Sequence, residues 1–404
     1  MTAPTLTSVS YHLDDLNSKD QYRQLPKIKH RDQWIIANDQ SLLNISSNDY
    51  LSLGNDTRLQ AQFLAQLQAL PESQLPKMGS TSSRLLTGNH EELQLLEEDL
   101  INWYHLALTP EQRRASTKSV LVINSGYHAN IGILPALAKL PLHTLIVSDE
   151  LIHASMIDGI RLTSSKHCTY KRYRHNDLEH LASIIESVDT SIERIIIVTE
   201  SIFSMDGDRA DLKALVKLKA TDPRIELYVD EAHAVGVLGR HGLGLSEETQ
   251  TLEAIDYLVG TFGKAFASMG AYIICDEKVR QWLINQMRSF IFSTALPPIT
   301  HSWTRFILEK MTSFHHLRTH LAQLSLQVIE AIEDSSTGRY QSPIIPYVLG
   351  SNESAINKAQ QLRDAGFYVL PIRPPTVPVG TARIRIVMNA KLTTEDCARL
   401  ISHL

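Results

Sequence analysis

The sequence predicts an α/β fold with a mostly parallel sheet covered by helices on both faces, an N-terminal arm and a smaller C-terminal α+β domain. Between residues 119 and 274 short apolar runs alternate with segments of helical period. Strands that alternate with helices form parallel sheets, and strands covered on both faces are apolar throughout. Beyond Pro297–Pro298 long helices and isolated strands replace this alternation. We therefore expect three parts: 1–56 as arm and hairpin, 57–296 as the large domain, and 297–404 as the small domain.

The first 118 residues predict an arm, a hairpin, two amphipathic helices and two loops. The helices are indicated by apolar side chains at helical spacing, and the loops by small, hydroxyl-bearing or charged residues. In chain order these elements are the arm 1–30, hairpin strands 34–37 and 42–45, a helix from about Thr57, the loop 79–90, a helix through 93–103, and the surface segment 109–118.

Six apolar runs of strand length predict the large sheet. They lie at 119–123, 144–147, 195–198, 225–229, 257–259 and 271–274, with helix-period segments such as 127–140 and 178–185 between most of them. In the small domain we expect two long helices, a strand at 347–349, a helix, strands at 368–372 and 382–388, and a last helix capped near Thr393.

Composition and charge indicate a soluble cytoplasmic protein. With a net charge of −5, the chain lacks the positive potential that would attract nucleic acid or anionic lipid. The three cysteines are far apart and lack metal-ligand spacing, as expected in a reducing compartment. The N-terminus lacks a basic segment followed by an apolar one, and no apolar run is long enough to span a bilayer. We therefore expect no membrane or nucleic-acid partner and no metal.

Three polar residues that follow strands favour pyridoxal phosphate chemistry. Asp230 ends the apolar run 225–229, His233 follows three residues later, and Lys264 follows the next run. In open α/β sheets ligands bind at the carboxyl ends of the strands. Pyridoxal phosphate binds covalently to a lysine and needs an anion that keeps its ring nitrogen protonated. Singly, these residues would be read as a solvated lysine, a turn-capping aspartate and a structural histidine; together they favour the cofactor.

His153 and Ser204 also follow predicted strands. The imidazole of His153 could stack on a cofactor ring, and the hydroxyl of Ser204 would face the same end of the sheet. Each residue alone is weak support, but convergence at strand ends gives them joint weight.

A phosphate group needs hydrogen-bond donors, and three segments offer them. Gly126 and Tyr127 follow Ser125 at a strand-to-helix turn, where free amide N–H groups favour an anion. Thr261 and Thr294 supply hydroxyls. Helix capping is the alternative role for such residues, and for Ser125 it is nearly as good an explanation.

Four arginines are candidates for a substrate carboxylate, which arginine binds in bidentate fashion. They are Arg23, Arg373, Arg383 and Arg385. Because Arg383 and Arg385 share one face of a predicted strand, we expect at least one of them to be a surface charge.

The segment Asp230–Glu231–Ala232–His233 also matches a sequence motif of helicases, which would make this protein a nucleic-acid motor. A helicase needs a phosphate-binding Gly-x-x-x-x-Gly-Lys-Ser/Thr motif upstream of that segment. Gly263–Lys264 lies downstream and is followed by Ala265. This alternative is therefore rejected.

These residues resemble the pyridoxal-phosphate-dependent α-oxoamine synthases, a family of aminotransferase fold type I with a seven-stranded sheet. The matching segments run in family order along nearly the whole chain: 43–51, 125–127, 153–155, 204–208, 230–233, 261–264 and 292–294. Within the family, 372–378 and 380–383 resemble the members of the biotin pathway. The chain departs from the family pattern in the loop 79–84, at Leu93 and in the apparent insertion 106–118.

The resemblance implies catalytic roles for Lys264, Asp230, His153 and His233, and a cofactor contact for Ser204. Lys264 would hold the cofactor covalently and move protons at the substrate α-carbon, and Asp230 would pair with the ring nitrogen. His153 would stack on the ring. His233 and Ser204 would contact the phenolic oxygen of the cofactor.

The resemblance also implies binding roles and a homodimer. Thr294 would reach the cofactor phosphate of the neighbouring subunit, so the active site would lie at the subunit interface. The cofactor would be held by Gly126, Tyr127 and Thr261, and the substrate by Arg23, His153, Thr376 and Arg385.

The activity that the resemblance implies is a decarboxylating condensation of L-alanine with a pimeloyl thioester, of coenzyme A or of an acyl-carrier protein, to 8-amino-7-oxononanoate. One alternative is another α-oxoamine synthase that uses glycine or serine, such as a 2-amino-3-ketobutyrate CoA ligase. A second is a non-catalytic scaffold subunit. Scaffold relatives lack the cofactor-binding lysine, and Lys264 is present.

Overall fold

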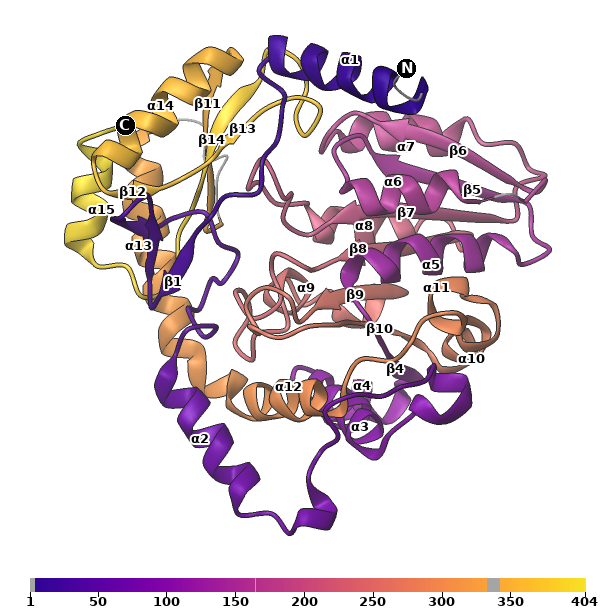
Figure 1. Ribbon diagram of the computed structural model, residues 1–404. Coiled ribbons are helices and arrows are strands. Elements are labelled where there is room, and N and C mark those ends of the chain that lie inside the picture. The colour runs from indigo at the N-terminus through magenta and orange to yellow at the C-terminus, as the bar shows by residue number, and fades with distance from the viewer. Residues whose placement is uncertain (1–3, 164, 333–341) are drawn as a thin grey trace. The chain divides into compact units, whose positions relative to one another are not determined.

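The computed structural model describes residues 4–163, 165–332 and 342–404 (Figure 1). The chain forms two compact units. The sheet unit contains Asn48–Ser204 and Asp208–His320, and the terminal unit contains Met1–Ser47, Met205–Gly207 and Leu321–Leu404. The units divide near 47 and 320, and the domain boundaries at 56 and 296 stay a prediction.

The sheet unit contains the large sheet, whose strands among the described residues have the order β4-β10-β9-β8-β7-β5-β6. Neighbouring strands from β6 to β9 are parallel, whereas β10 pairs antiparallel with both β9 and β4. The strands are β4 (Lys118–Ile123), β5 (Thr144–Asp149), β6 (Cys168–Tyr173), β7 (Arg194–Glu200), β8 (Ile225–Asp230), β9 (Tyr257–Thr261) and β10 (Ala271–Asp276). The predicted mostly parallel sheet is therefore confirmed.

All six predicted runs form strands of this sheet, and β6 is the strand that the pattern missed. Consecutive residues of β7 are buried, so both faces of the sheet are covered. By contrast, four of the six residues of β6, at one edge of the sheet, are exposed, whereas β4 at the other edge is mostly buried. An exposed polar edge strand lacks the apolar run by which buried strands are detected.

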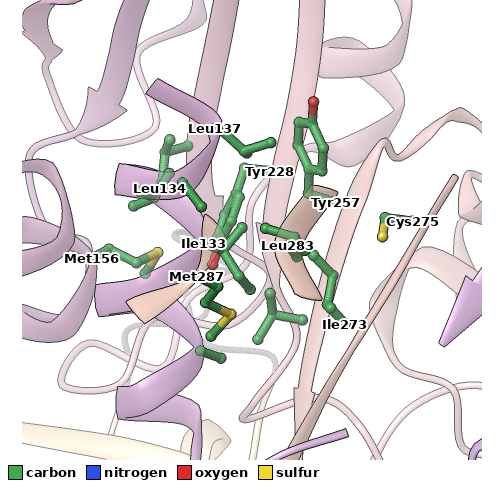
Figure 2. Packing of buried hydrophobic residues seen from close by; sticks show 14 of the residues in the cluster. Ile133, Leu134, Leu137, Met156, Tyr228, Tyr257, Ile273, Cys275, Leu283 and Met287 are labelled. Atoms are coloured by element: carbon green, nitrogen blue, oxygen red, sulfur yellow. The ribbon is translucent and has the colours of Figure 1, made fainter. Parts of the chain in front are cut away.

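Helices flank the sheet (Figure 1). Side chains of α5 and α6 pack with strand residues and with Leu283 and Met287 in one hydrophobic core (Figure 2). In chain order the helices of this unit are α2 (Thr57–Gln68), α3 (Glu91–Leu106), α4 (Pro110–Ala115), α5 (Gly126–Ala138), α6 (Ala154–Arg161), α7 (Leu178–Glu186), α8 (Leu212–Lys219), α9 (Leu245–Glu248), α10 (Glu277–Gln286), α11 (Arg288–Ile291) and α12 (Pro298–Met311). The predicted surface segment 109–118 holds the exposed α4, and the predicted loop 79–90 contains a helical turn at Arg84–Gly88.

The terminal unit holds two small sheets, with orders β1-β2-β3-β12 and β11-β14-β13. The predicted hairpin is confirmed as β2 and β3. The predicted strand 368–372 is instead two short strands in different sheets. The elements are α1 (Pro4–Ser18), β1 (Lys29–Arg31), β2 (Trp34–Ala37), β3 (Gln40–Asn44), most of α13 (His315–Ile332), β11 (Ile344–Gly350), α14 (Asn352–Asp364), β12 (Phe367–Tyr368), β13 (Pro371–Ile372), β14 (Ala382–Val387) and α15 (Thr394–Ile401).

Two local predictions about this unit are also confirmed. The hydroxyl of Thr393 caps α15 and forms a capping box with Asp396, which satisfies backbone N–H groups of the first turn. The N-terminal helix α1 buries none of its described side chains, as expected of a polar arm. In the part of the chain that the structure describes, no helix is both long and apolar enough to cross a bilayer.

Candidate active site

Four predicted catalytic or cofactor-binding residues of the sheet unit lie at or just beyond the carboxyl ends of neighbouring parallel strands. Asp230 is the last residue of β8, His153 follows β5, Ser204 follows β7 and Lys264 follows β9. Because β5, β7, β8 and β9 are parallel neighbours, their carboxyl ends lie along one edge of the sheet. Ligands of open α/β sheets bind at this edge.

Lys264 and His233 are in direct contact. Nζ of Lys264 lies 2.8 Å from Nε2 of His233, and Nδ1 of the same ring lies 2.6 Å from the hydroxyl of Tyr50. The Tyr50 hydroxyl lies 3.3 Å from Oδ1 of Asn48. When the lysine is protonated it donates to Nε2, so the ring proton sits on Nδ1 and points at Tyr50. Tyr50 lies in a segment that matched the family, but no role had been predicted for it.

Asp230 is buried and is held by two donors. Its Oδ2 accepts a hydrogen bond from Nδ2 of Asn130 at 2.8 Å, and its Oδ1 accepts one from the backbone N–H of Ala232 at 2.8 Å. Asn130 is itself fixed, because its Oδ1 accepts from the Tyr228 hydroxyl at 2.5 Å. Both oxygens of its carboxyl group are therefore held in a fixed orientation. Asn130 was missed in the sequence, where a polar residue within an otherwise apolar helix was the available signal.

The contacts of His153 favour a neutral imidazole with its proton on Nε2. The backbone N–H of Ser155 donates to Nδ1 at 3.2 Å, which makes Nδ1 the acceptor, and the Ser155 hydroxyl lies 2.7 Å from the same nitrogen. Burial lowers the pKa of His153, and the charge of Lys264 lowers it further against the opposing effect of Asp230. A neutral ring suits the predicted stacking role.

Glu200 is a site residue that the sequence reasoning missed. It is the last residue of β7 and lies opposite Asp230 in the sheet register. Burial raises the pKa of Glu200 well above its usual value, and the charge of Asp230 adds to this shift. The nearby backbone N–H groups of His153 and Ser204 oppose this rise in the pKa. The signal was available, since Glu200 closes an apolar run just as Asp230 does.

The N-terminus of α5 forms the candidate phosphate end of the site. Ser125 caps the helix through its hydroxyl, which accepts from the backbone N–H of His128 at 3.2 Å, so the cap alternative is confirmed for Ser125. Gly126 and Tyr127 are the first two residues of the helix, where amide N–H groups lack intrahelical partners. A side chain at Gly126 would approach Thr261 to 3.8 Å, so the two residues adjoin.

The hydroxyl groups near this helix end are engaged within the chain. Thr261 Oγ1 donates to the carbonyl of Gly270 at 3.0 Å, and the Tyr127 hydroxyl donates to Asp158 at 2.8 Å. The carbonyl of Thr294 accepts from Asn124 at 2.7 Å, next to the β-bridge between Ser83 and Thr294. Thr261 would have to reorient its hydroxyl in order to donate to a phosphate.

The predicted substrate-binding residues Arg23, Thr376 and Arg385 lie in the terminal unit. Nη2 of Arg23 donates to Oγ1 of Thr376 at 2.8 Å, so two of them contact each other. The expectation that Arg383 or Arg385 is a surface charge is wrong, because both are buried. The guanidinium of Arg383 is bound to Asp206 at 2.6 Å, while Arg373 donates to the carbonyl of Asp20.

The residues of the sheet unit fit pyridoxal phosphate. They supply a lysine amine, a buried carboxylate held by two donors, a neutral imidazole and a helix N-terminus with free N–H groups. The lysine would hold the cofactor covalently, the carboxylate would keep its ring nitrogen protonated, and the helix end would bind its phosphate.

Comparison with known proteins agrees with this assignment. The family model for aminotransferases of class I and II matches residues 40–404. The 8-amino-7-oxononanoate synthase of Haemophilus ducreyi is 50% identical over 386 residues, covering 94% of this chain and 95% of that protein. A provisionally named 8-amino-7-oxononanoate synthase of Pasteurella multocida is 49% identical over 392 residues, covering 96% of each.

Solved structures share the fold. The serine palmitoyltransferase of Sphingomonas wittichii has a TM-score of 0.82 at 24% identity and covers 98% of this chain and 95% of that one. The 8-amino-7-oxononanoate synthase of Francisella tularensis has a TM-score of 0.70 at 24% identity, covering 90% of this chain and 96% of that one. Aminotransferase fold type I is therefore confirmed. The chain belongs to the class I and II aminotransferase family and, within it, to the pyridoxal-phosphate-dependent α-oxoamine synthases.

Proposed function

We propose that this enzyme condenses L-alanine with a pimeloyl thioester in biotin biosynthesis. The products are 8-amino-7-oxononanoate, carbon dioxide and the free thiol. The observation that carries the proposal is the 2.8 Å approach of the Lys264 amine to His233 beside the strand-end carboxylate of Asp230. The names of relatives that are about half identical over nearly the full chain support the choice of alanine and pimeloyl substrates.

When bound, pyridoxal phosphate supplies an electron-accepting ring that stabilises negative charge at the α-carbon of the amino acid. Lys264 then acts as the base that removes the α-proton, and after loss of carbon dioxide it returns a proton to the same carbon. Asp230 holds a proton on the ring nitrogen, and the neutral His153 lies against the ring. His233 and Ser204 hydrogen-bond to the phenolic oxygen.

The substrate groups are assigned to the terminal unit. Arg385 binds the substrate carboxylate in bidentate fashion, because a buried guanidinium offers a rigid pair of donors to a planar anion. The contact between Arg23 and Thr376 supports a shared role for these two residues in holding the acyl chain.

We further propose a homodimer in which Thr294 reaches the phosphate site of the partner subunit. Large apolar side chains are exposed on two segments joined by the Ser83–Thr294 bridge: Met78 (78%), Leu86 (79%) and Phe292 (70%). Exposed apolar side chains gathered on adjoining segments are typical of protein interfaces. A second copy of this chain would cover them.

A complementation experiment tests the shared site. In a mixed dimer of Lys264→Ala and Thr294→Ala chains, one site carries both changes and the other carries neither. Each variant alone should be inactive or weak, and the mixture should regain activity after subunit exchange. A monomer by sedimentation, or a mixture no more active than its components, contradicts the proposal.

A substrate panel tests the reaction itself. The holoenzyme is incubated with L-alanine, glycine or L-serine, each with pimeloyl-coenzyme A or a pimeloyl-carrier protein, and the products are identified by mass spectrometry. Of the three amino acids, only L-alanine is expected to give 8-amino-7-oxononanoate. The thioester that supports this reaction identifies the acyl carrier. Turnover of glycine or serine in place of alanine overturns the substrate assignment. Borohydride reduction should label the Lys264 peptide, whereas an unlabelled peptide favours a scaffold.

The proposed location is the cytoplasm. All three cysteines (Cys168, Cys275 and Cys397) are free thiols. Free thiols are typical of a reducing compartment. Fractionation of the producing cells with an antibody against the chain tests the location.

A further inference from the structure

A histidine outside the site described above joins the two loops that carry His153 and Ser204. His175 follows β6, and its Nδ1 lies 3.0 Å from Oδ1 of Asp149 while its Nε2 lies 2.7 Å from Oδ2 of Asp208. Asp149 ends β5, four residues before His153, and Asp208 lies four residues after Ser204. One imidazole therefore connects both loops.

The charges of this bridge favour a permanent imidazolium. Ionised carboxylates only accept hydrogen bonds, so each ring nitrogen must donate. Burial lowers the pKa of His175, but the hydrogen bonds to Asp149 and Asp208 outweigh it and raise this pKa to about 10. Both carboxylates are buried, with Asp149 fully inaccessible, so the histidine cation compensates charges that are costly to bury alone.

Asn176 makes a second connection between the same two acids. Its backbone N–H donates to Oδ2 of Asp149 at 2.8 Å, and its side-chain amide donates to Oδ2 of Asp208 at 2.8 Å. The backbone N–H of Leu151 donates to Oδ1 of Asp149 at 2.8 Å, which fixes the loop in the direction of His153. The two acids are thus held by neighbouring residues of one turn.

His175 also contacts the residue next to Ser204. The His175 ring stands edge-on to Phe203, with ring centroids 4.4 Å apart. Phe203 directly precedes Ser204, and its backbone N–H donates to the carbonyl of Asp208 at 3.0 Å, which closes the turn 203–208.

We propose that His175 is a positioning residue that sets the spacing between His153 and Ser204 through its bonds to Asp149 and Asp208. The proposal rests on the cofactor-binding roles proposed above for His153 and Ser204. Without His175, two buried carboxylates lose their shared cation, and the remaining link through Asn176 holds the spacing of the loops less firmly. The ring-stacking imidazole and the hydroxyl then no longer face one ligand together.

The test compares His175→Phe, which keeps a ring against Phe203 but cannot donate, with Asp208→Asn, which removes the charge of one carboxylate and weakens the bonds that His175 and Asn176 make to it. The matched control is His143→Asn, an exposed histidine that directly precedes the first residue of β5. Cofactor affinity is measured by titrating the cofactor-free protein with pyridoxal phosphate, and the geometry of the bound ring by visible circular dichroism. Hydrogen bonds to charged groups predict an affinity loss of about tenfold or more for His175→Phe.

The expected result is a folded His175→Phe protein with weakened cofactor binding and an altered visible dichroism band, an intermediate effect for Asp208→Asn, and no change for His143→Asn. Wild-type affinity and dichroism in His175→Phe overturn the proposal. If the His175→Phe variant does not fold, nitrogen NMR of the histidine rings in the wild-type protein provides a second test. A His175 ring that carries only one proton at pH 8 also overturns the proposal. None of these readouts depends on which amino acid or thioester the enzyme uses.

Discussion

The hydroxyl of Tyr50 lies 2.6 Å from Nδ1 of His233, although the two residues are 183 positions apart in the chain. Nε2 of the same ring lies 2.8 Å from the amine of Lys264. A neutral imidazole carries one proton, so a donor on one side makes the other side an acceptor. The contact with Tyr50, whose hydroxyl donates to Asn48, therefore favours a proton on Nδ1 and leaves Nε2 to accept from the lysine.

Replacing Tyr50 with Phe should lower kcat/KM without unfolding the protein. The ring still fills its buried position, but the hydrogen bond to His233 is lost, and such bonds contribute about 1 kcal/mol, or roughly fivefold in rate. The pH profile of kcat should shift along with the rate, because the Lys264 amine contacts the same imidazole. Tyr11→Phe, on the exposed face of α1, is the matched control. An unchanged profile in Tyr50→Phe rules out the coupling.

Replacing Asn130 with Ala should reduce both stability and cofactor affinity. The substitution removes a donor from Asp230 and the acceptor of the buried Tyr228 hydroxyl. Leaving a buried hydroxyl without its partner costs about 1–3 kcal/mol. Urea unfolding of the cofactor-free protein measures the first effect, and titration with pyridoxal phosphate the second. Asn285→Ala, whose amide bonds only to the carbonyl of Gln281 on an exposed helix face, should change neither.

The bridge of His175 should make stability depend on alkaline pH. Its pKa is raised from 6.5 to about 10 in the folded protein. Between these values the folded state keeps a proton that the unfolded state has lost, so the contribution is complete below 6.5 and is lost as pH rises towards 10. The charged groups facing the ring are Asp149 and Asp208, with Glu150 accepting the His175 backbone N–H.

Chemical unfolding at several pH values checks this dependence. The stability difference between wild type and His175→Phe should shrink as pH rises from 6.5 to 10. A difference that stays constant across this range contradicts a charged His175.

His301 should have the opposite effect in acid. Burial lowers its pKa to about 4, and the charge of Arg84 contributes to the shift. Between 6.5 and 4 the unfolded state binds a proton that the folded state does not, so stability falls as pH drops through this window. His301→Asn should flatten that fall in urea unfolding, whereas His316→Asn, at an exposed site, should not. Equal slopes for wild type and His301→Asn refute the assignment.

The sequence predicts well those parts of the molecule in which burial shapes the residue pattern. The strands of the large sheet were found because both of their faces are covered, and Asp230 and Lys264 were found because they follow such strands. The edge strand β6 was missed because its side chains are mostly exposed. The order of the motifs along the chain then indicated the family.

The partners of the catalytic residues were beyond reach of the sequence alone. Asn130 lies 100 positions from Asp230, and Tyr50 lies 183 positions from His233. Their contacts depend on how α5 and the segment after β3 approach the strand ends, which no local spacing encodes. The mutual contact of Arg23 and Thr376, 353 positions apart, is of the same kind.

The exposed edge strand β6 has a consequence for self-association. An edge strand presents unpaired backbone groups to which a foreign strand could add, and charged side chains discourage such pairing. Lys171 and Arg172 are exposed on β6 and place two positive charges along this edge. Like charges on a second molecule would repel strand-to-strand contact there. Exchanging both for valine should therefore lower the concentration at which the protein begins to form aggregates, while its folded core is left unaltered.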